Sequence, residues 1–204
     1  MVGRRQSASG LKLAGSLILV AVIQFILLMT VSEALYPHYS VSANYISDLG
    51  VGTTAPIFNT SIALLGVAVV AAAYLMRRGL GSMVFSVLVA LAGIGAICIG
   101  VFNESFGMLH TYVSVWTFLF GAFAMLYSVR ITRWPLGYLS APLGLLSLFS
   151  LAMLGFFPQA FGLGVGGFER LVVYPFLLWG LALGGYMLGL ASRGDAQEAS
   201  SNEG

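Results

Sequence analysis

Seven side chains able to do acid–base, metal or ion-pair chemistry lie between or just inside the long apolar runs of the sequence. Two of them, His110 and Arg170, stand at the start of such a run, where an ionisable group is costly beside lipid. Groups of this kind usually face the interior of a helix bundle, and they are candidates for a functional site. The seven are Glu33, His38, Asp48, Glu104, His110, Glu169 and Arg170.

His110 heads a polar and small helical face that continues through Ser114, Thr117 and Gly121. These residues share a face because they follow the i, i+4, i+7, i+11 spacing of a helix. Glu104 precedes the run, where the helix dipole favours an anion. One interpretation is a His–carboxylate pair that acts as general base and orienter, or as metal ligands. The other is a hydrogen-bonded histidine that ties two helices together, with Glu104 as a capping acid, and both stay open.

Asp48 lies in the longest connection between apolar runs, residues 35–56. Long loops in compact proteins are usually functional, so Asp48 joins His110 and Glu104 as a catalytic candidate. If a metal is bound, the same three residues are the candidate ligands. The alternative is a turn or helix cap in which Asp48 accepts hydrogen bonds from backbone N–H groups.

Glu169 and Arg170 are neighbours at the mouth of the last apolar run. Adjacent helical residues point about 100° apart, so each is expected to reach a different partner. Arg170 is predicted to pair with Asp48 or Glu104, or to hold an anionic head group. Glu169 is predicted to reach a polar group or water, and the glycine-rich stretch 162–167 before it to act as a hinge. The candidates for substrate binding are Arg170, Glu169, Asn44 and Ser47.

The composition places these residues in a membrane protein. Of 204 residues, 59% are apolar and 8% are charged, and the mean hydropathy is +0.96, whereas a soluble domain carries about 25% charged residues. A soluble fold and a disordered chain are both excluded. Binding to nucleic acid is excluded as well, because the nine scattered cations form no basic stripe. The lone Cys98 excludes an intramolecular disulfide framework and a cysteine-ligated zinc cluster.

Six apolar runs are long enough to cross a hydrocarbon core as helices, which takes about 20 residues. The sequence therefore predicts an all-α, polytopic six-helix bundle that forms a single domain over residues 1–192. The polar residues 193–204 are predicted to be a disordered cytoplasmic tail. The runs are residues 11–34, 57–76, 80–102, 108–129, 135–157 and 171–191.

Lysine and arginine positions predict the orientation of the bundle. Eight of the nine cations fall on one side of the six runs, and Arg170 is the exception. By the positive-inside bias, both termini are cytoplasmic in a multi-pass protein of the cell membrane. A cleaved signal peptide is the alternative for the first run, but that run exceeds the usual 7–15 residues. Glycine pairs at a spacing of four in the last run, such as Gly180 and Gly184, suit helix packing and a homo- or hetero-oligomer.

Three short motifs occur in the order associated with one family. They are Asn44-Tyr45-Ile46-Ser47-Asp48-Leu49-Gly50, then Gly100-Val101-Phe102-Asn103-Glu104 with His110, then Gly167-Phe168-Glu169-Arg170 with Trp179. Over nearly its whole length the chain resembles the multi-span membrane family known as domain of unknown function 998. The resemblance implies a shared bundle and shared outer polar positions, and it implies no reaction. One departure is Asn103, where other members often carry a proline.

Two classes of function remain open, one enzymatic and one not. The first is a protein that acts on or binds a lipid or lipid-linked substrate at the outer mouth of the bundle. The second is a non-catalytic small-solute transporter or partner-binding subunit whose polar cluster is an ion-pair network. A distant comparison is with membrane hydrolases that hold zinc with three histidines. This chain has only two, so Asp48 or Glu104 would have to complete such a site, and no cofactor is assigned. A cavity open to lipid favours the first class, and a closed network favours the second.

Overall fold

The computed structural model describes residues 2–202, and within them it contains helices and no strand. All six long helices are apolar enough to cross a membrane, which confirms the all-α, polytopic prediction. The long helices are α1 (Val2–Leu35), α2 (Ala55–Gly79), α3 (Met83–Val101), α4 (Met108–Ser128), α5 (Leu136–Phe156) and α6 (Gly164–Asn202). Short 3₁₀ turns are η1 (Ser47–Gly50), η2 (Gly52–Thr54), η3 (Glu104–Phe106) and η4 (Ala160–Gly162).

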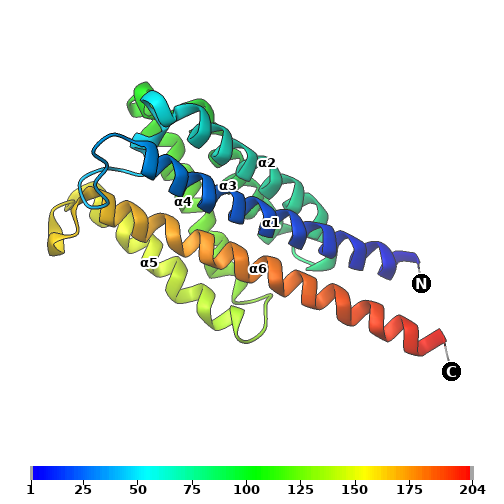
Figure 1. Ribbon diagram of the computed structural model, residues 1–204. Helices are drawn as coiled ribbons and strands as arrows, with labels where there is room; N and C mark the ends of the chain where they lie inside the picture. The colour runs from blue at the N-terminus through cyan, green and yellow to red at the C-terminus, as the bar shows by residue number, and fades with distance from the viewer. Residues whose placement is uncertain (1, 203–204) are drawn as a thin grey trace.

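The helices run alternately up and down, so both ends of the chain lie at the same end of the bundle (Figure 1). We call this the basic end, because the arginines that close α2 and follow α4 lie there. The opposite end, here called the acidic end, carries residues 36–54, 102–107 and 157–163, which join α1 to α2, α3 to α4 and α5 to α6. The cytoplasmic location of the termini stays a prediction.

Each helix packs against the next along the chain, and α6 closes against α1. The six helices therefore form a ring, across whose interior α4 also touches α6. Helix backbones approach closely at glycines, as expected where van der Waals contact replaces the hydrophobic effect. A Cβ at Gly15 would lie 2.7 Å from the carbonyl oxygen of Gly184, and one at Gly66 would lie 2.6 Å from that of Gly93.

These contacts divide the glycines of α6 into two sets. Gly180 and Gly184 face α1, where a Cβ would lie 3.2 Å from Val22 and 2.8 Å from Leu19. Gly185 and Gly189 would meet nothing within 4 Å. The first pair packs against α1 within the chain, whereas the second pair makes no such contact, and an oligomer contact through α6 stays a prediction.

The end of α6 differs from the sequence prediction. Residues from Arg193 onward are predicted to be disordered, but the helix continues to Asn202. Alanine, glutamine and glutamate in this stretch have high helix propensity, and they extend a helix that the bundle has already nucleated. Residues 203 and 204 lie outside the described part of the chain.

Candidate functional site

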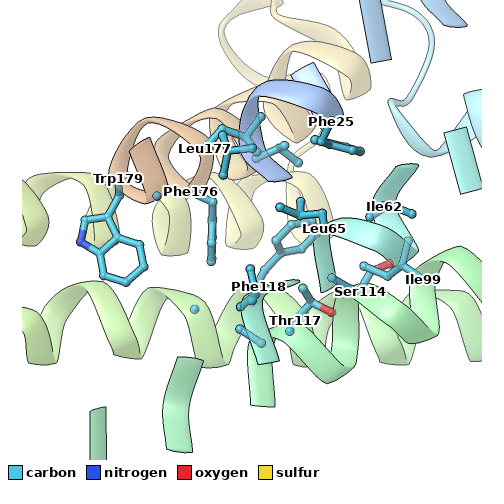
Figure 2. Close-up of a pocket in the computed structure, with 18 of the residues that line it drawn as sticks. Phe25, Ile62, Leu65, Ile99, Ser114, Thr117, Phe118, Phe176, Leu177 and Trp179 are labelled. Atoms are coloured by element: carbon cyan, nitrogen blue, oxygen red, sulfur yellow. The ribbon is translucent and has the colours of Figure 1, made fainter. Parts of the chain in front are cut away.

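A cavity of about 130 Å³ lies inside the helix ring. Its walls come from α1, α2, α3, α4 and α6, and Figure 2 shows Phe25, Phe118 and Phe176 turned toward it from three of these helices. Along α4 the lining residues run from His110 to Ala124. This stretch of helix is about 20 Å long at 1.5 Å per residue, so the cavity is long and narrow.

Polar lining residues gather toward the acidic end of this cavity. They come from η1, α4 and α6, whereas the remaining lining residues are apolar or glycine. No lysine or arginine of the described chain lines the cavity. The cavity is therefore an apolar slot with one polar end. The polar lining residues are Ser47, His110, Ser114, Thr117 and Glu169.

His110 is buried, and both of its ring nitrogens have partners. Nδ1 lies 2.8 Å from the carbonyl oxygen of Phe102, one of the carbonyls left over where α3 ends. Since a carbonyl only accepts, this contact requires a proton on Nδ1, and in the neutral imidazole Nε2 is then the acceptor. Nε2 lies 3.4 Å from Ser114 Oγ. Of the two interpretations of His110, these contacts match the hydrogen-bonded histidine that ties two helices together, because the imidazole bonds to the end of α3 and not to Glu104.

Asp48 and Glu104 lie together at the acidic end. In Asp48, Oδ2 accepts hydrogen bonds from Asn44 Nδ2 at 2.8 Å and from the Tyr45 backbone N–H at 3.0 Å. Of the two interpretations of Asp48, these contacts match the turn, in which the carboxylate accepts a hydrogen bond from a backbone N–H group. Burial is the largest cause that raises the pKa of Glu104 to about 8, and a hydrogen bond with Asp48 and the negative charge of Asp48 contribute to the same shift. Glu104 therefore holds its proton at neutral pH and shares a hydrogen bond with Asp48.

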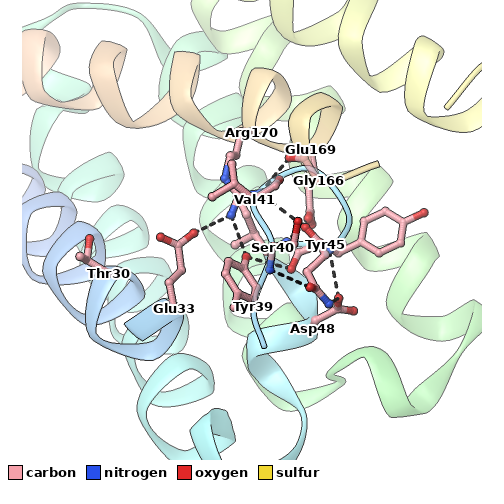
Figure 3. A network of polar contacts seen from close by, with 12 residues as sticks. Thr30, Glu33, Tyr39, Ser40, Val41, Tyr45, Asp48, Gly166, Glu169 and Arg170 are labelled. Atoms are coloured by element: carbon pink, nitrogen blue, oxygen red, sulfur yellow. Dashed lines mark hydrogen bonds and ion pairs between the residues drawn. The ribbon is translucent and has the colours of Figure 1, made fainter. Parts of the chain in front are cut away.

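Arg170 lies in a closed network at the acidic end (Figure 3). Its Nη2 donates to Glu33 Oε1 at 2.6 Å and to Tyr39 OH at 2.7 Å. Its Nη1 donates to the carbonyl oxygens of Val41 and Gly166, both at 2.9 Å. The guanidinium thus joins α1, the α1–α2 connection and α6. The prediction that Arg170 pairs with Asp48 or Glu104 is wrong. The guanidinium instead bonds to Glu33 of α1 and to Tyr39, which the folded-back α1–α2 connection brings beside it.

Tyr39 is a member of this network that the sequence analysis missed. Its hydroxyl accepts from Arg170 and donates to the carbonyl oxygen of Tyr45 at 3.1 Å. Burial raises the pKa of Tyr39 to about 12, although the hydrogen bond from Arg170 opposes the shift. Tyr39 therefore stays a neutral phenol. Charge balance in the sequence could have predicted the Glu33–Arg170 pair of this network. Glu33 is the single acid in the first apolar run and needs a buried cation as its partner.

Glu169 is buried beside Arg170 and reaches a different partner, as the sequence predicts. One of its carboxylate oxygens accepts a hydrogen bond from the backbone N–H of Ile46. The glycines before it hold the same loop against α6. The Gly166 backbone N–H donates to the Ser42 carbonyl oxygen at 3.1 Å, and a Cβ at Gly166 would strike the carbonyl oxygens of Val41 and Asn44. The glycine-rich stretch 162–167, predicted to be a hinge, thus forms the surface against which the α1–α2 connection packs.

The candidate metal ligands do not form a site. Among residues 2–202 no three histidine, cysteine, aspartate or glutamate side chains come close enough to hold a metal ion. The reason is geometric, because His110 directs one nitrogen to Phe102 and the other to Ser114. Asp48 and Glu104 pair with each other instead.

Comparison with known proteins identifies the family. Residues 19–186 match the family described as protein of unknown function (DUF998). No curated protein and no solved structure matches the chain. The match extends from α1 into α6 and includes the cavity's polar end and the Arg170 network. The motifs around Asp48, Glu104 and Glu169 indicated the same family, and the chain belongs to the DUF998 family.

Proposed function

We infer that this membrane protein binds the apolar chain of a neutral lipid or lipid-linked molecule inside the helix ring, with the polar end of that molecule at the acidic end. One observation carries the proposal: the interior cavity is long, apolar and polar at one end only. The lining matches an amphipathic ligand, because small-molecule sites are mostly apolar and carry a few convergent polar groups, and the volume of about 130 Å³ gives room for part of an apolar chain.

Dispersion supplies the reason for a chain to enter the cavity. A lipid chain in the bilayer is already away from water, so the hydrophobic effect gives little net drive. An empty apolar void, however, leaves its lining atoms without contacts on one side. Phe25, Leu65 and Leu177 are among these lining side chains. A narrow chain restores their contacts, and the polar end then decides the direction in which the chain lies.

The charges at the polar end favour a neutral head group over an anionic one. The lining includes the carboxyl group of Glu169 and no cation of the described chain. Arg170, the predicted anion-binding residue, has five acceptors on its two terminal nitrogens. A phosphate would have to displace them, so Arg170 supports the loop instead. Hydroxyl and ester groups suit Ser47, Ser114 and His110, which offer neutral hydrogen-bonding atoms.

Photocrosslinking tests the proposal directly. The full chain is reconstituted in vesicles of phosphatidylethanolamine and phosphatidylglycerol that contain a diacylglycerol with a diazirine in one acyl chain. After irradiation, mass spectrometry locates the crosslinked residues. We expect crosslinks at the interior residues Leu65 and Phe118 as well as at the lipid-facing Leu64 and Leu178. Crosslinks at lipid-facing residues alone would overturn the proposal.

Two matched variants sharpen the test. Ala96→Phe puts a ring into the cavity, whereas Ala71→Phe adds the same ring on the exposed face of α2. We expect interior crosslinks to disappear in the first variant and to persist in the second. Ala92→Leu, a smaller filling substitution on the same wall of α3, serves if Ala96→Phe does not fold. Unchanged interior crosslinks in a folded filling variant would count against the cavity as the binding site.

A further inference from the structure

Ser114 and His110 form a nucleophile–base pair at the polar end of the cavity. The Phe102 carbonyl oxygen, 2.8 Å from Nδ1, holds the imidazole so that Nε2 faces Ser114 Oγ at 3.4 Å. A serine, a histidine and a third group that orients the histidine are the elements of an activated nucleophile. A distance of 3.4 Å is within the range of such pairs before substrate binds.

Ser114 differs from other interior hydroxyl groups of the bundle. Thr117, Ser128 and Ser140 donate to backbone carbonyl oxygens of their own helices, at 2.6, 2.7 and 2.7 Å. This is the usual way for a helical serine or threonine to satisfy its hydroxyl. Ser114 Oγ instead contacts a ring nitrogen that carries a free lone pair. Its hydroxyl therefore has a proton acceptor rather than a structural carbonyl.

The place of Ser114 in the cavity suggests what it would meet. It lies one helical turn below His110, and Thr117 and then Phe118 follow it along the lining of α4. A lipid held with its head at the acidic end brings the junction between head and chain to this level. In neutral lipids that junction is commonly an ester.

We propose that Ser114 is the nucleophile, and His110 its general base, in cleavage of an ester in a neutral lipid bound in the cavity. This rests on the proposed function, since the bound chain presents the ester. Ser47, which lines the same end, offers a hydroxyl to the carbonyl oxygen where negative charge develops.

The chemical step balances with water as the second reactant. Ser114 Oγ bonds to the ester carbonyl carbon while its proton passes to His110 Nε2. The bond from that carbon to the alcohol oxygen breaks, and the alcohol leaves with the Nε2 proton. A water from the acidic end then attacks the acyl-serine and gives a proton to Nε2. The bond from the acyl carbon to Oγ breaks, Oγ takes that proton, and a fatty acid is released.

A lipophilic fluorophosphonate tests this assignment, because it phosphonylates an activated serine and needs no knowledge of the substrate. The full chain in detergent micelles is treated with the probe, and the adduct is located by mass spectrometry. We expect one adduct on Ser114, none in Ser114→Ala, and labelling at least about tenfold slower in His110→Gln. Ser61 and Ser147, whose hydroxyls donate to backbone carbonyls, are internal controls that stay unlabelled.

Two outcomes would overturn the assignment. The first is the absence of an adduct on the folded wild-type chain, and the second is an equal labelling rate in folded His110→Gln. If His110→Gln does not fold, Ser114→Cys in a Cys98→Ala background replaces it. The alkylation rate of the introduced thiol is then compared with that of an exposed thiol. An equal or lower rate would count against activation by His110. If Ser114 is not labelled but the interior photocrosslinks are found, the proposed ester cleavage is overturned and the proposed lipid binding stands.

Discussion

Arg170 and His110 lie at the same end of the bundle and are buried to a similar degree, but their surroundings differ. Arg170 donates hydrogen bonds to five acceptors from three segments and does not line the cavity. His110 lines the cavity, and only one of its nitrogens is fixed by a backbone group. The first arrangement is a closed network, and the second leaves an imidazole nitrogen beside a serine hydroxyl at the wall of the cavity.

The difference shows that the cost of placing an ionisable side chain beside lipid does not by itself identify a reactive residue. Both residues satisfy the criterion that buried ionisable groups mark functional sites. What separates them is the kind of partner and the access to the cavity. A guanidinium whose two terminal nitrogens are hydrogen-bonded supports structure, whereas an imidazole nitrogen beside a serine hydroxyl can accept a proton.

Removal of the Arg170 side chain should have the largest effect. In Arg170→Met the Glu33 carboxylate is left without its cation, and losing one partner of a buried pair costs about 3–5 kcal/mol. Arg170→Lys keeps the charge but loses the fork that reaches several acceptors, so we expect a loss of about 1–3 kcal/mol. Unfolding in mixed detergent–dodecyl sulfate micelles measures both. Equal stability of wild type and Arg170→Met would show that the network does not stabilise the fold.

A second prediction concerns the surface on which the α1–α2 connection rests. In Gly166→Ala the new methyl group meets the carbonyl oxygens of Val41 and Asn44, and overpacking of this kind costs about 1–3 kcal/mol. Gly185→Ala is the matched control on the same helix, since its Cβ meets nothing within 4 Å. We expect the control to keep or slightly raise the unfolding free energy. The same loss in both variants would show that the loop contact of Gly166 does not decide the effect, because alanine has a higher helix propensity than glycine at either position.

A third, smaller prediction is a pH dependence from Glu104. Its pKa is raised from 4.5 to about 8 in the folded protein, mainly by burial. The stabilising contribution is therefore complete below the unfolded pKa, about 4.5, and is lost as the pH rises through the folded value, about 8. Thermal unfolding should show the wild-type midpoint falling across this range, and Glu104→Gln should show a smaller fall. Parallel curves for the two proteins would contradict the shared proton.

Hydropathy and charge predicted much of this molecule from the sequence. The length of the apolar runs against the thickness of a bilayer predicted six spans. The cost of burying ionisable groups identified the residues of the acidic end as candidates for a functional site. The partners of these residues did not follow, because they depend on how residues 36–46 fold back over α6. The choice of Glu33 over Asp48 as the partner of Arg170 is a contact between residues 137 positions apart.

The interior cavity was also beyond sequence reasoning. The face from His110 to Gly121 was predicted to look into the bundle, and its residues do line the cavity. Whether such a face packs tightly or leaves a void depends on side chains from four other helices. Gly121 illustrates this dependence, because a Cβ there would meet the Phe176 ring. A spacing rule for one helix carries no information about that ring.

The most direct test of the division between the two regions compares His110→Gln with Tyr39→Phe. Each protein is examined for its unfolding midpoint and for fluorophosphonate labelling of Ser114. We expect His110→Gln to label slowly with a midpoint near wild type, because glutamine can still donate to the Phe102 carbonyl. Tyr39→Phe should lose about 1–2 kcal/mol of stability, since it removes the hydroxyl between Arg170 and Tyr45, and it should label normally. The opposite pattern, with His110→Gln unstable but fully labelled and Tyr39→Phe stable but unlabelled, would contradict the account.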